Sequence, residues 1–222
     1  MKEIQNKIVF IQTNNTTIAL LTSPVSVSPS AEEVIRHTFG EDYFASLDQK
    51  RGTSRTHSLL GACLLYALCE RLSLLCEDLT VKRNCHGKPY FVSADGVFFS
   101  ISHDARKNSD TLAILSALSL SGDTGADVML LPPTQSRETQ LDIAKRFMCE
   151  CDYEKLIALG DDDKRRDEVF SSLWTAREAY SKLLGGKLSD ALGVPIPENL
   201  ALITKTMDVD GVRICYSICK QK

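Results

Sequence analysis

The chain has 222 residues, of which 43% are hydrophobic and 25% charged, and its formal net charge is −3. This composition is typical of a globular protein with a substantial core, so the chain is expected to be folded rather than disordered. A slightly acidic chain has no overall attraction to nucleic acid, so any anionic ligand must be held by local cations.

No membrane or export signal is apparent. The first residues carry mixed charge and lack a secretory or transit pattern. The most apolar run, residues 59–69, is shorter than the roughly 20 residues that a bilayer span needs. We therefore expect a cytoplasmic protein with no membrane partner.

The eight cysteines are scattered, and most lie in apolar runs, which indicates reduced core residues. A zinc site normally uses clustered pairs of ligands. Only the spacing of Cys149 and Cys151, and the neighbours Cys85 and His86, come near that pattern. Metal binding through sulfur is the alternative reading of these positions.

In the first half of the chain, hydrophobic periodicity predicts two strands joined by a turn at Asn14 and Asn15, two helices and a third strand. In chain order these are residues 7–12, 17–22, 31–40, 58–72 and 97–103. Residues 58–72 are apolar almost all round, which predicts a buried central helix. The strand at 97–103 ends on His103, a position that is usually exposed.

The second half predicts two buried strands, two helices and a hairpin. In chain order these are residues 112–120, 125–131, 143–148, 171–184, 200–206 and 212–218. Strands, one long helix and further strands thus occur twice. This order predicts an α+β fold with two similar halves, residues 1–110 and 111–222.

The helix at 171–184 places a carboxylate and an ammonium group on one face. Its apolar residues recur at steps of three and four, and Gly185 and Gly186 follow it as a stop signal. Glu178 and Lys182 are one turn apart, so they can reach the same volume and hold a metal and a phosphate together. The alternative is an exposed helical ion pair worth roughly 0.2–0.5 kcal/mol.

Asp127 stands inside the apolar strand 125–131. Burial of an unpaired carboxylate is costly, so we expect Asp127 at a strand end, hydrogen-bonded, or facing a cation. A purely structural, paired aspartate is the alternative.

Four blocks of sequence occur in a fixed order. They are Gly87-Lys88-Pro89, Phe99-Ser100-Ile101-Ser102-His103, Gly125-x-Asp127, and Trp174-x-x-Arg177-Glu178-Ala179-Tyr180-x-Lys182. Together they resemble the signature of the Sfp-type 4′-phosphopantetheinyl transferases over roughly residues 50–195. The region around Lys145 and Arg146 also resembles that family.

The resemblance implies a fold and an activity. The fold would be two pseudo-symmetric halves, each a small antiparallel sheet packed on a long helix, with the active site in the cleft between them. The enzyme would be a holo-[acyl-carrier-protein] synthase that uses Mg²⁺ to transfer the 4′-phosphopantetheine arm of coenzyme A. The acceptor would be a serine of an apo acyl, peptidyl or aminoadipate carrier protein, the by-product would be 3′,5′-ADP, and the enzyme would act as a monomer.

The resemblance also implies roles for individual residues. Asp127 and Glu178 would bind Mg²⁺, and Glu178 would also be the base. Lys182 would hold the α-phosphate, and His103 would contact the pyrophosphate. Further nucleotide contacts would come from Lys88, Ser102 and Ser58, with Arg51 or Arg55 at the 3′-phosphate.

Three departures from the family pattern bear on this reading. Met129 stands where many bacterial members carry a third acid, so the metal site would have one carboxylate fewer. Arg177 replaces a common lysine, and the chain ends soon after its last hairpin. Two alternatives follow: a non-catalytic protein that binds coenzyme A or a carrier protein, which Met129 favours, and a structural protein with no ligand.

Overall fold

The computed structural model describes residues 1–13, 15–75, 79–107, 109–186 and 188–222. The helices are α1 (Lys2–Gln5), α2 (Pro29–Phe39), α3 (Glu41–Asp48), α4 (Thr53–Arg71), α5 (Arg137–Phe147), α6 (Glu150–Ile157), α7 (Asp163–Leu184) and the 3₁₀ helix η1 (Leu188–Ala191). The strands are β1 (Val9–Thr13), β2 (Thr16–Leu21), β3 (Val81–Arg83), β4 (Pro89–Phe91), β5 (Phe98–Ala105), β6 (Leu112–Ser119), β7 (Thr124–Leu130), β8 (Leu200–Val209) and β9 (Val212–Gln221).

Two antiparallel sheets form the centre of the protein. The N-terminal sheet has the strand order β1-β2-β6-β5, and the C-terminal sheet has the order β7-β9-β8. A small separate hairpin joins β3 and β4. β5 is therefore an edge of the N-terminal sheet and β7 an edge of the C-terminal sheet.

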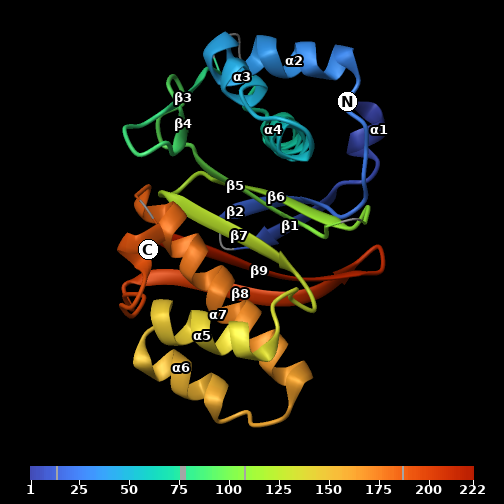
Figure 1. Cartoon of the computed structure of the whole chain (residues 1–222). Helices are drawn as coiled ribbons and strands as arrows, with labels where there is room; N and C mark the ends of the chain where they lie inside the picture. The colour runs from blue at the N-terminus through green and yellow to red at the C-terminus, as the bar shows by residue number, and fades with distance from the viewer. Residues whose placement is uncertain (14, 76–78, 108, 187) are drawn as a thin grey trace.

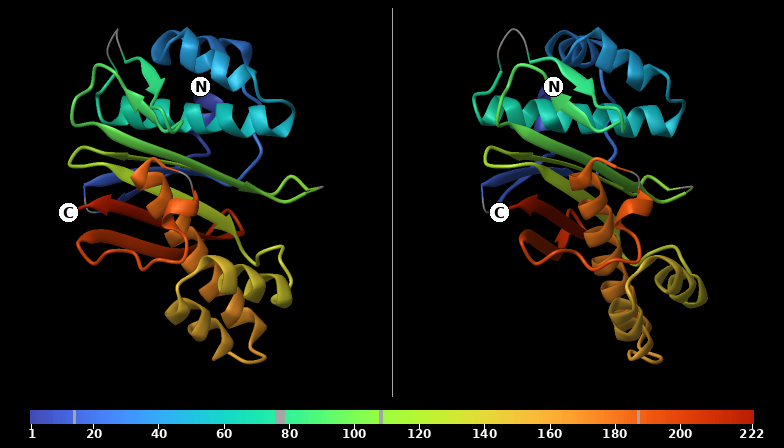
Figure 2. Two further views of the ribbon diagram at one scale, coloured as in Figure 1. Left: turned by 60° about the vertical axis from the view of Figure 1, so that its left-hand side comes forward. Right: turned by 90° about the vertical axis from the view of Figure 1, so that its left-hand side faces the viewer.

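The sheets are stacked between two long helices, as Figure 1 shows. α4 covers one face of the N-terminal sheet with a core that includes Leu64, Leu68 and Ile114. The other face packs on the C-terminal sheet through residues such as Leu115 and Tyr216. α7 lies on the far face of the C-terminal sheet. The result is four layers, helix, sheet, sheet and helix, which Figure 2 shows from two further directions.

α4 is buried along most of its length, which confirms the prediction of a central apolar helix at 58–72. It begins at Thr53, several residues before the predicted start. α2 begins at Pro29, because Ser28 caps it by accepting a hydrogen bond from the Ala31 N–H.

α7 is longer than predicted because the charged residues before Ser171 belong to it. Asp162 caps its first turn by accepting from the Arg165 N–H, so the helix starts at Asp163. Gly185 ends it in the left-handed conformation at a φ of 65°, as the glycine pair predicted. α5 likewise begins at Arg137 rather than near residue 143.

The strands that were predicted lie close to their expected positions, and the hairpin of β8 and β9 lies where it was predicted. Asn14, in the first predicted turn, is outside the described residues. α3 and the β3–β4 hairpin were not predicted. β6 starts at Leu112, just past the expected division near residue 110, and pairs with β2 and β5, so the N-terminal sheet uses residues on both sides of that position.

The described cysteines form no disulfide. Four of them, Cys63, Cys69, Cys215 and Cys219, are buried. Among the residues with described structure, we find no helix with the length and apolar character of a membrane span.

Candidate functional site

The edges of the two sheets meet where β5 runs beside β7. No backbone ladder joins them. Instead, three side chains on one face of β5 bond to β7: Ser100 accepts from the Ala126 N–H at 2.9 Å, Ser102 donates to Asp127, and Asp104 accepts from the Leu130 N–H at 2.8 Å. We call this contact the β5–β7 seam. The alternation of polar residues in β5, where polar side chains point toward the other sheet, makes the seam possible.

Gly125 brings the catalytic candidates of two elements together. A Cβ atom at this position would lie 2.0 Å from the Ala179 carbonyl oxygen and 2.3 Å from the Leu183 backbone nitrogen. Only glycine therefore allows α7 to lie this close to β7. Asp127, two residues along the same strand, faces the same side and meets the α7 residues one turn apart, Glu178 and Lys182.

Asp127 is buried and bound on one oxygen by two groups. Its Oδ1 accepts from Lys182 Nζ at 2.6 Å and from Ser102 Oγ at 2.6 Å, and Lys182 Nζ is also 2.9 Å from Ser102 Oγ. The Asp127 side chain is 7% exposed and that of Lys182 30%. The expectation of a hydrogen-bonded aspartate facing a cation is confirmed. The hypothesis of an exposed Glu178–Lys182 pair does not describe Lys182, which pairs with Asp127 instead.

Two further polar residues of α7, on the turns before Glu178, are buried as well. Ser171 and Thr175 are fully covered, and Thr175 Oγ1 lies 2.8 Å from Ser217 Oγ on β9. β9 places Ser217 and Cys215, rather than large apolar residues, opposite this part of α7.

Glu178 lies half-buried beside this network. Burial and the negative charge of Asp127 together raise the pKa of its carboxyl to about 7, against the opposing effects of Lys182 and a hydrogen bond from Trp174. Two carboxylates that repel each other, with one shared ammonium group, form a site suited to an additional cation. Glu178 is also poised to exchange a proton near neutral pH.

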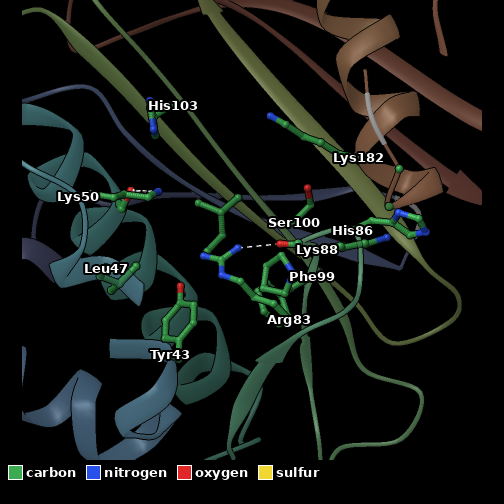
Figure 3. A pocket seen from close by; sticks show the side chains of 16 residues that line it. Tyr43, Leu47, Lys50, Arg83, His86, Lys88, Phe99, Ser100, His103 and Lys182 are labelled. Atoms are coloured by element: carbon green, nitrogen blue, oxygen red, sulfur yellow. Dashed lines mark hydrogen bonds between the residues drawn. The ribbon is translucent and has the colours of Figure 1, made fainter. Parts of the chain in front are cut away.

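A cavity of about 290 Å³ opens beside the seam, and Figure 3 shows its side chains. Six of the described residues that line it carry basic groups: Lys50, Arg83, His86, Lys88, His103 and Lys182. None of the described residues that line it is acidic. In a chain with net negative charge, this concentration of lysine and arginine side chains indicates an anion site. We call it the cationic cavity.

Each wall of the cationic cavity is held by its own contacts. Lys88 Nζ donates to Asp123 Oδ1 at 2.6 Å and to the Leu183 carbonyl at 2.9 Å, which ties the β3–β4 hairpin to the end of α7. On the opposite wall, Lys50 Nζ donates to Ser58 Oγ at 2.6 Å. Burial lowers the pKa of Lys50, and the charge of Arg83 lowers it further. A bound anion would relieve that repulsion.

His103 separates the cationic cavity from a second, more open hollow of about 1050 Å³. Its ring lies 5.2 Å from that of His57 on α4. His103 is exposed, as predicted, yet desolvation by the surrounding protein and the charges of His57, Lys50 and Lys182 together lower its pKa to about 4, against the opposing charge of Asp127. The imidazole is therefore neutral at pH 7.

The structure separates the predicted residues into three groups. Asp127, Glu178, Lys182 and Ser102 meet at the seam, and Lys88, His103 and Ser58 line the cationic cavity with Lys182. Arg51 and Arg55 do not line it. Arg55 instead binds Glu32 and Asp48, each at 2.8 Å, and these bonds raise its pKa.

Three basic residues of the cavity were missed: Lys50, Arg83 and His86. Arg83 and His86 come from the β3–β4 hairpin, which was not predicted because its strands have three residues each. Arg83 Nη1 donates to the Gly87 carbonyl at 2.8 Å, as Figure 3 shows. The only available signal was their position next to Gly87-Lys88-Pro89.

Met129 and Arg177, the two departures from the family pattern inside the site blocks, both take part in packing around α7. Met129 packs against the apolar cluster between α5, α6 and α7, where Trp174 also lies. Arg177 is 2% exposed and donates to Asp152 and to the carbonyls of Ala191 and Val194. It points away from the seam and anchors the segments packed around α7.

The comparison with protein families adds an independent observation. Residues 123–210 match the family model described as the 4′-phosphopantetheinyl transferase superfamily. That segment contains Asp127, Glu178 and Lys182, whereas Lys88, Ser102 and His103 precede it. The match thus covers the part of the site that β7 and α7 contribute.

Two curated relatives are similar to parts of this chain. Protein slr0495 of Synechocystis sp., whose name marks its assignment as a 4′-phosphopantetheinyl transferase as not yet established, is 30% identical over 175 residues, 78% of this chain and 63% of that protein. The 4′-phosphopantetheinyl transferase HetI of Nostoc sp. is 35% identical over 102 residues, 45% of this chain and 38% of HetI. The matches thus span less than two thirds of each relative.

Proposed function

We propose that the chain is an Sfp-type 4′-phosphopantetheinyl transferase, with coenzyme A as donor and an apo carrier protein as acceptor. The observation that carries this proposal is the cationic cavity, which has no acidic residue among the described residues that line it and leads through Lys182 to the acids Asp127 and Glu178. The superfamily match over residues 123–210 and the two relatives support the same assignment.

The cationic cavity suits the nucleotide end of coenzyme A. Its phosphates carry several negative charges, which Lys50, Arg83 and Lys88 can neutralise. Tyr43 and Phe99 offer apolar surface for the base. Because Arg55 is engaged with two acids, we assign the 3′-phosphate to Lys50 and Arg83 in place of Arg51 and Arg55.

The acids at the seam fit Mg²⁺. Asp127 and Glu178 provide carboxylate oxygens that repel each other, and Mg²⁺ prefers one or two carboxylates together with phosphate oxygens and waters. When bound, the ion would neutralise the charge that develops on the phosphates. Met129 adds no oxygen, so phosphate and water would complete the coordination.

The transfer itself would use three residues of this chain. Glu178 takes the proton of the carrier serine, whose oxygen attacks the β-phosphorus of coenzyme A as the bond to the bridging oxygen breaks. Lys182 holds the α-phosphate and stabilises the leaving 3′,5′-ADP. His103, neutral at pH 7, donates one hydrogen bond to the pyrophosphate.

The same proposal covers organisation. The active site lies between two units, each a sheet with its long helix, that divide after β6. We propose that the enzyme acts as a cytoplasmic monomer on acyl, peptidyl or aminoadipate carrier proteins.

The test is transfer to a panel of apo carrier proteins. Purified protein, coenzyme A and Mg²⁺ are incubated with each carrier, and intact mass reports the added phosphopantetheine arm. We expect at least one carrier to gain the arm on its serine. Tight binding of coenzyme A with no transfer to any carrier would support the binding-only alternative.

A further inference from the structure

A pair of thiols lies beneath α7, away from the seam. Cys149 is the N-cap residue of α6, and Cys151 lies in its first turn. Their sulfur atoms are 2.9 Å apart, closer than ordinary contact between two sulfurs, so the two side chains point at one another. Cys151 is exposed and Cys149 half-buried. Reagents in solution can therefore reach the pair.

Cys149 is hydrogen-bonded to Arg177, the residue that anchors neighbouring segments to α7. Arg177 Nη2 donates to Cys149 Sγ at 3.1 Å and to Asp152 Oδ2 at 2.8 Å. Arg177 precedes Glu178 on α7 and is almost fully buried. A change in the position of Cys149 thus acts directly on the residue next to Glu178.

A soft metal ion is the first alternative, because both sulfurs and an Asp152 oxygen lie within 4.8 Å of one another. The surrounding charges oppose it. Asp152 already accepts from Arg177 at 2.8 Å and from Lys155 at 2.9 Å. A metal ion would lie beside two positive side chains and would have to displace them from its carboxylate ligand.

We propose that Cys149 and Cys151 form a reversible disulfide that changes the packing of Arg177 and therefore of α7. With hydrogen peroxide as oxidant, the two thiols lose two protons and two electrons as the sulfur–sulfur bond forms. The peroxide takes them up and leaves as two molecules of water. A dithiol reductant returns the pair to thiols through exchange.

The order of the two steps follows from exposure. Cys151 attacks the peroxide first and becomes a sulfenic acid, because it is the accessible sulfur. Burial raises the pKa of Cys149, and its bonds to Cys151 and Asp152 raise it further, so Cys149 stays a thiol until the neighbouring sulfur is oxidised. It then displaces water from the sulfenic acid and closes the disulfide.

The protein contains its own reporter. Trp174 is the single tryptophan and lies one turn before Arg177. It packs in the same apolar cluster as Met148 and Leu156, which precede and follow the two cysteines in the sequence. If closure of the disulfide moves α6 against α7, the fluorescence of Trp174 changes. This signal does not depend on any transferase activity.

The experiment treats the full chain with stepwise additions of hydrogen peroxide. We expect a mass lower by two hydrogen atoms, a cross-link mapped to Cys149 and Cys151, and a shift in Trp174 fluorescence, all reversed by dithiothreitol. Cys151→Ser and Cys149→Ser should each abolish the cross-link and the shift. Cys85→Ser, which removes an exposed cysteine elsewhere, should retain both.

Three outcomes would overturn the proposal. The pair could stay reduced at a peroxide dose that oxidises Cys85. The disulfide could form without any change in Trp174 fluorescence, which would disconnect it from α7. Stoichiometric binding of Zn²⁺ that protects both thiols from peroxide would make the pair a metal site instead.

Discussion

Each long helix approaches an edge strand through a glycine, but the two contacts differ in kind. Where α4 meets β5, a Cβ at Gly61 would lie 2.6 Å from Ile101 Cγ2, a side-chain methyl group. Where α7 meets β7, a Cβ at Gly125 would lie 2.0 Å from a backbone oxygen. The first neighbour can rotate or shift, whereas the second is fixed in the helix.

The difference corresponds to what each contact does. The α4 contact is part of a large apolar core and contributes Ser58 and His57 to the edge of the site. The α7 contact fixes the distance between Asp127 and Lys182. Where backbone meets backbone, the relative position of two charged groups is held more firmly than side-chain packing alone could hold it.

The largest expected effect comes from adding one methyl group to each contact. Gly125→Ala should cost several kcal/mol or prevent folding, because the helix must move off the strand. Gly61→Ala should cost only about 1–2 kcal/mol, since Ile101 can shift and alanine is the better helix former. Denaturant unfolding of both variants measures the difference. Equal losses would show that the two contacts are equivalent.

The second prediction separates chemistry from stability. Asp127→Ala should lower the transfer rate by about a thousandfold or more, because a metal carboxylate and the partner of Lys182 are lost together. Ser116→Ala, on β6 beside the α4 contact, removes a 2.8 Å bond to the Gly61 carbonyl and should change stability but not rate. Circular dichroism checks both folds. A turnover of Asp127→Ala close to that of the parent protein would remove Asp127 from the site.

The third prediction compares two lysines on opposite walls of the cationic cavity. Lys182→Met should lower kcat by about a hundredfold, as loss of one fixed charge does at a phosphoryl-transfer site. Lys50→Met should mainly raise the KM for coenzyme A. Steady-state kinetics with one carrier protein distinguishes the two. If Lys182→Met left kcat unchanged, Lys182 would have only a structural role.

The smallest effect concerns pH. The pKa of Glu178 is raised from 4.5 to about 7 in the folded protein, so the unfolded chain ionises first as pH rises. Metal-free stability should therefore fall between pH 4.5 and 7 by on the order of 1–3 kcal/mol, and the penalty stays in place above pH 7.

Glu178→Gln removes that penalty. The variant should gain more stability over the parent at pH 8 than at pH 4.5, as chemical unfolding at both pH values would show. A gain that is the same at both would mean that the Glu178 carboxyl has no raised pKa.

Sequence reasoning was most successful where the periodicity was strong. The apolar helix around Leu64, the strand around Asp127 and the helix end at Gly185 can all be recognised from the residue pattern alone. The pairing of Lys182 with Asp127, by contrast, depends on how closely α7 lies on β7. Nothing in the order of residues gives that distance, although Gly125 allows it.

The basic side chains of the cavity show the same limit. Lys50, Arg83 and His86 lie in short or irregular segments, which carry no periodic signal. Arg55 looked equally suitable in sequence, yet Glu32 from α2 occupies it. Which cation is free to meet a ligand is decided by tertiary contacts between distant segments.

The central claim is that the seam acids hold Mg²⁺ against coenzyme A in the cationic cavity. Calorimetric titration with coenzyme A, with and without Mg²⁺, tests it without knowledge of the carrier protein. We predict that Mg²⁺ tightens binding at least tenfold in the parent protein and has little effect in Asp127→Asn. Equal tightening in both proteins, or no binding of coenzyme A to the parent, would contradict the account.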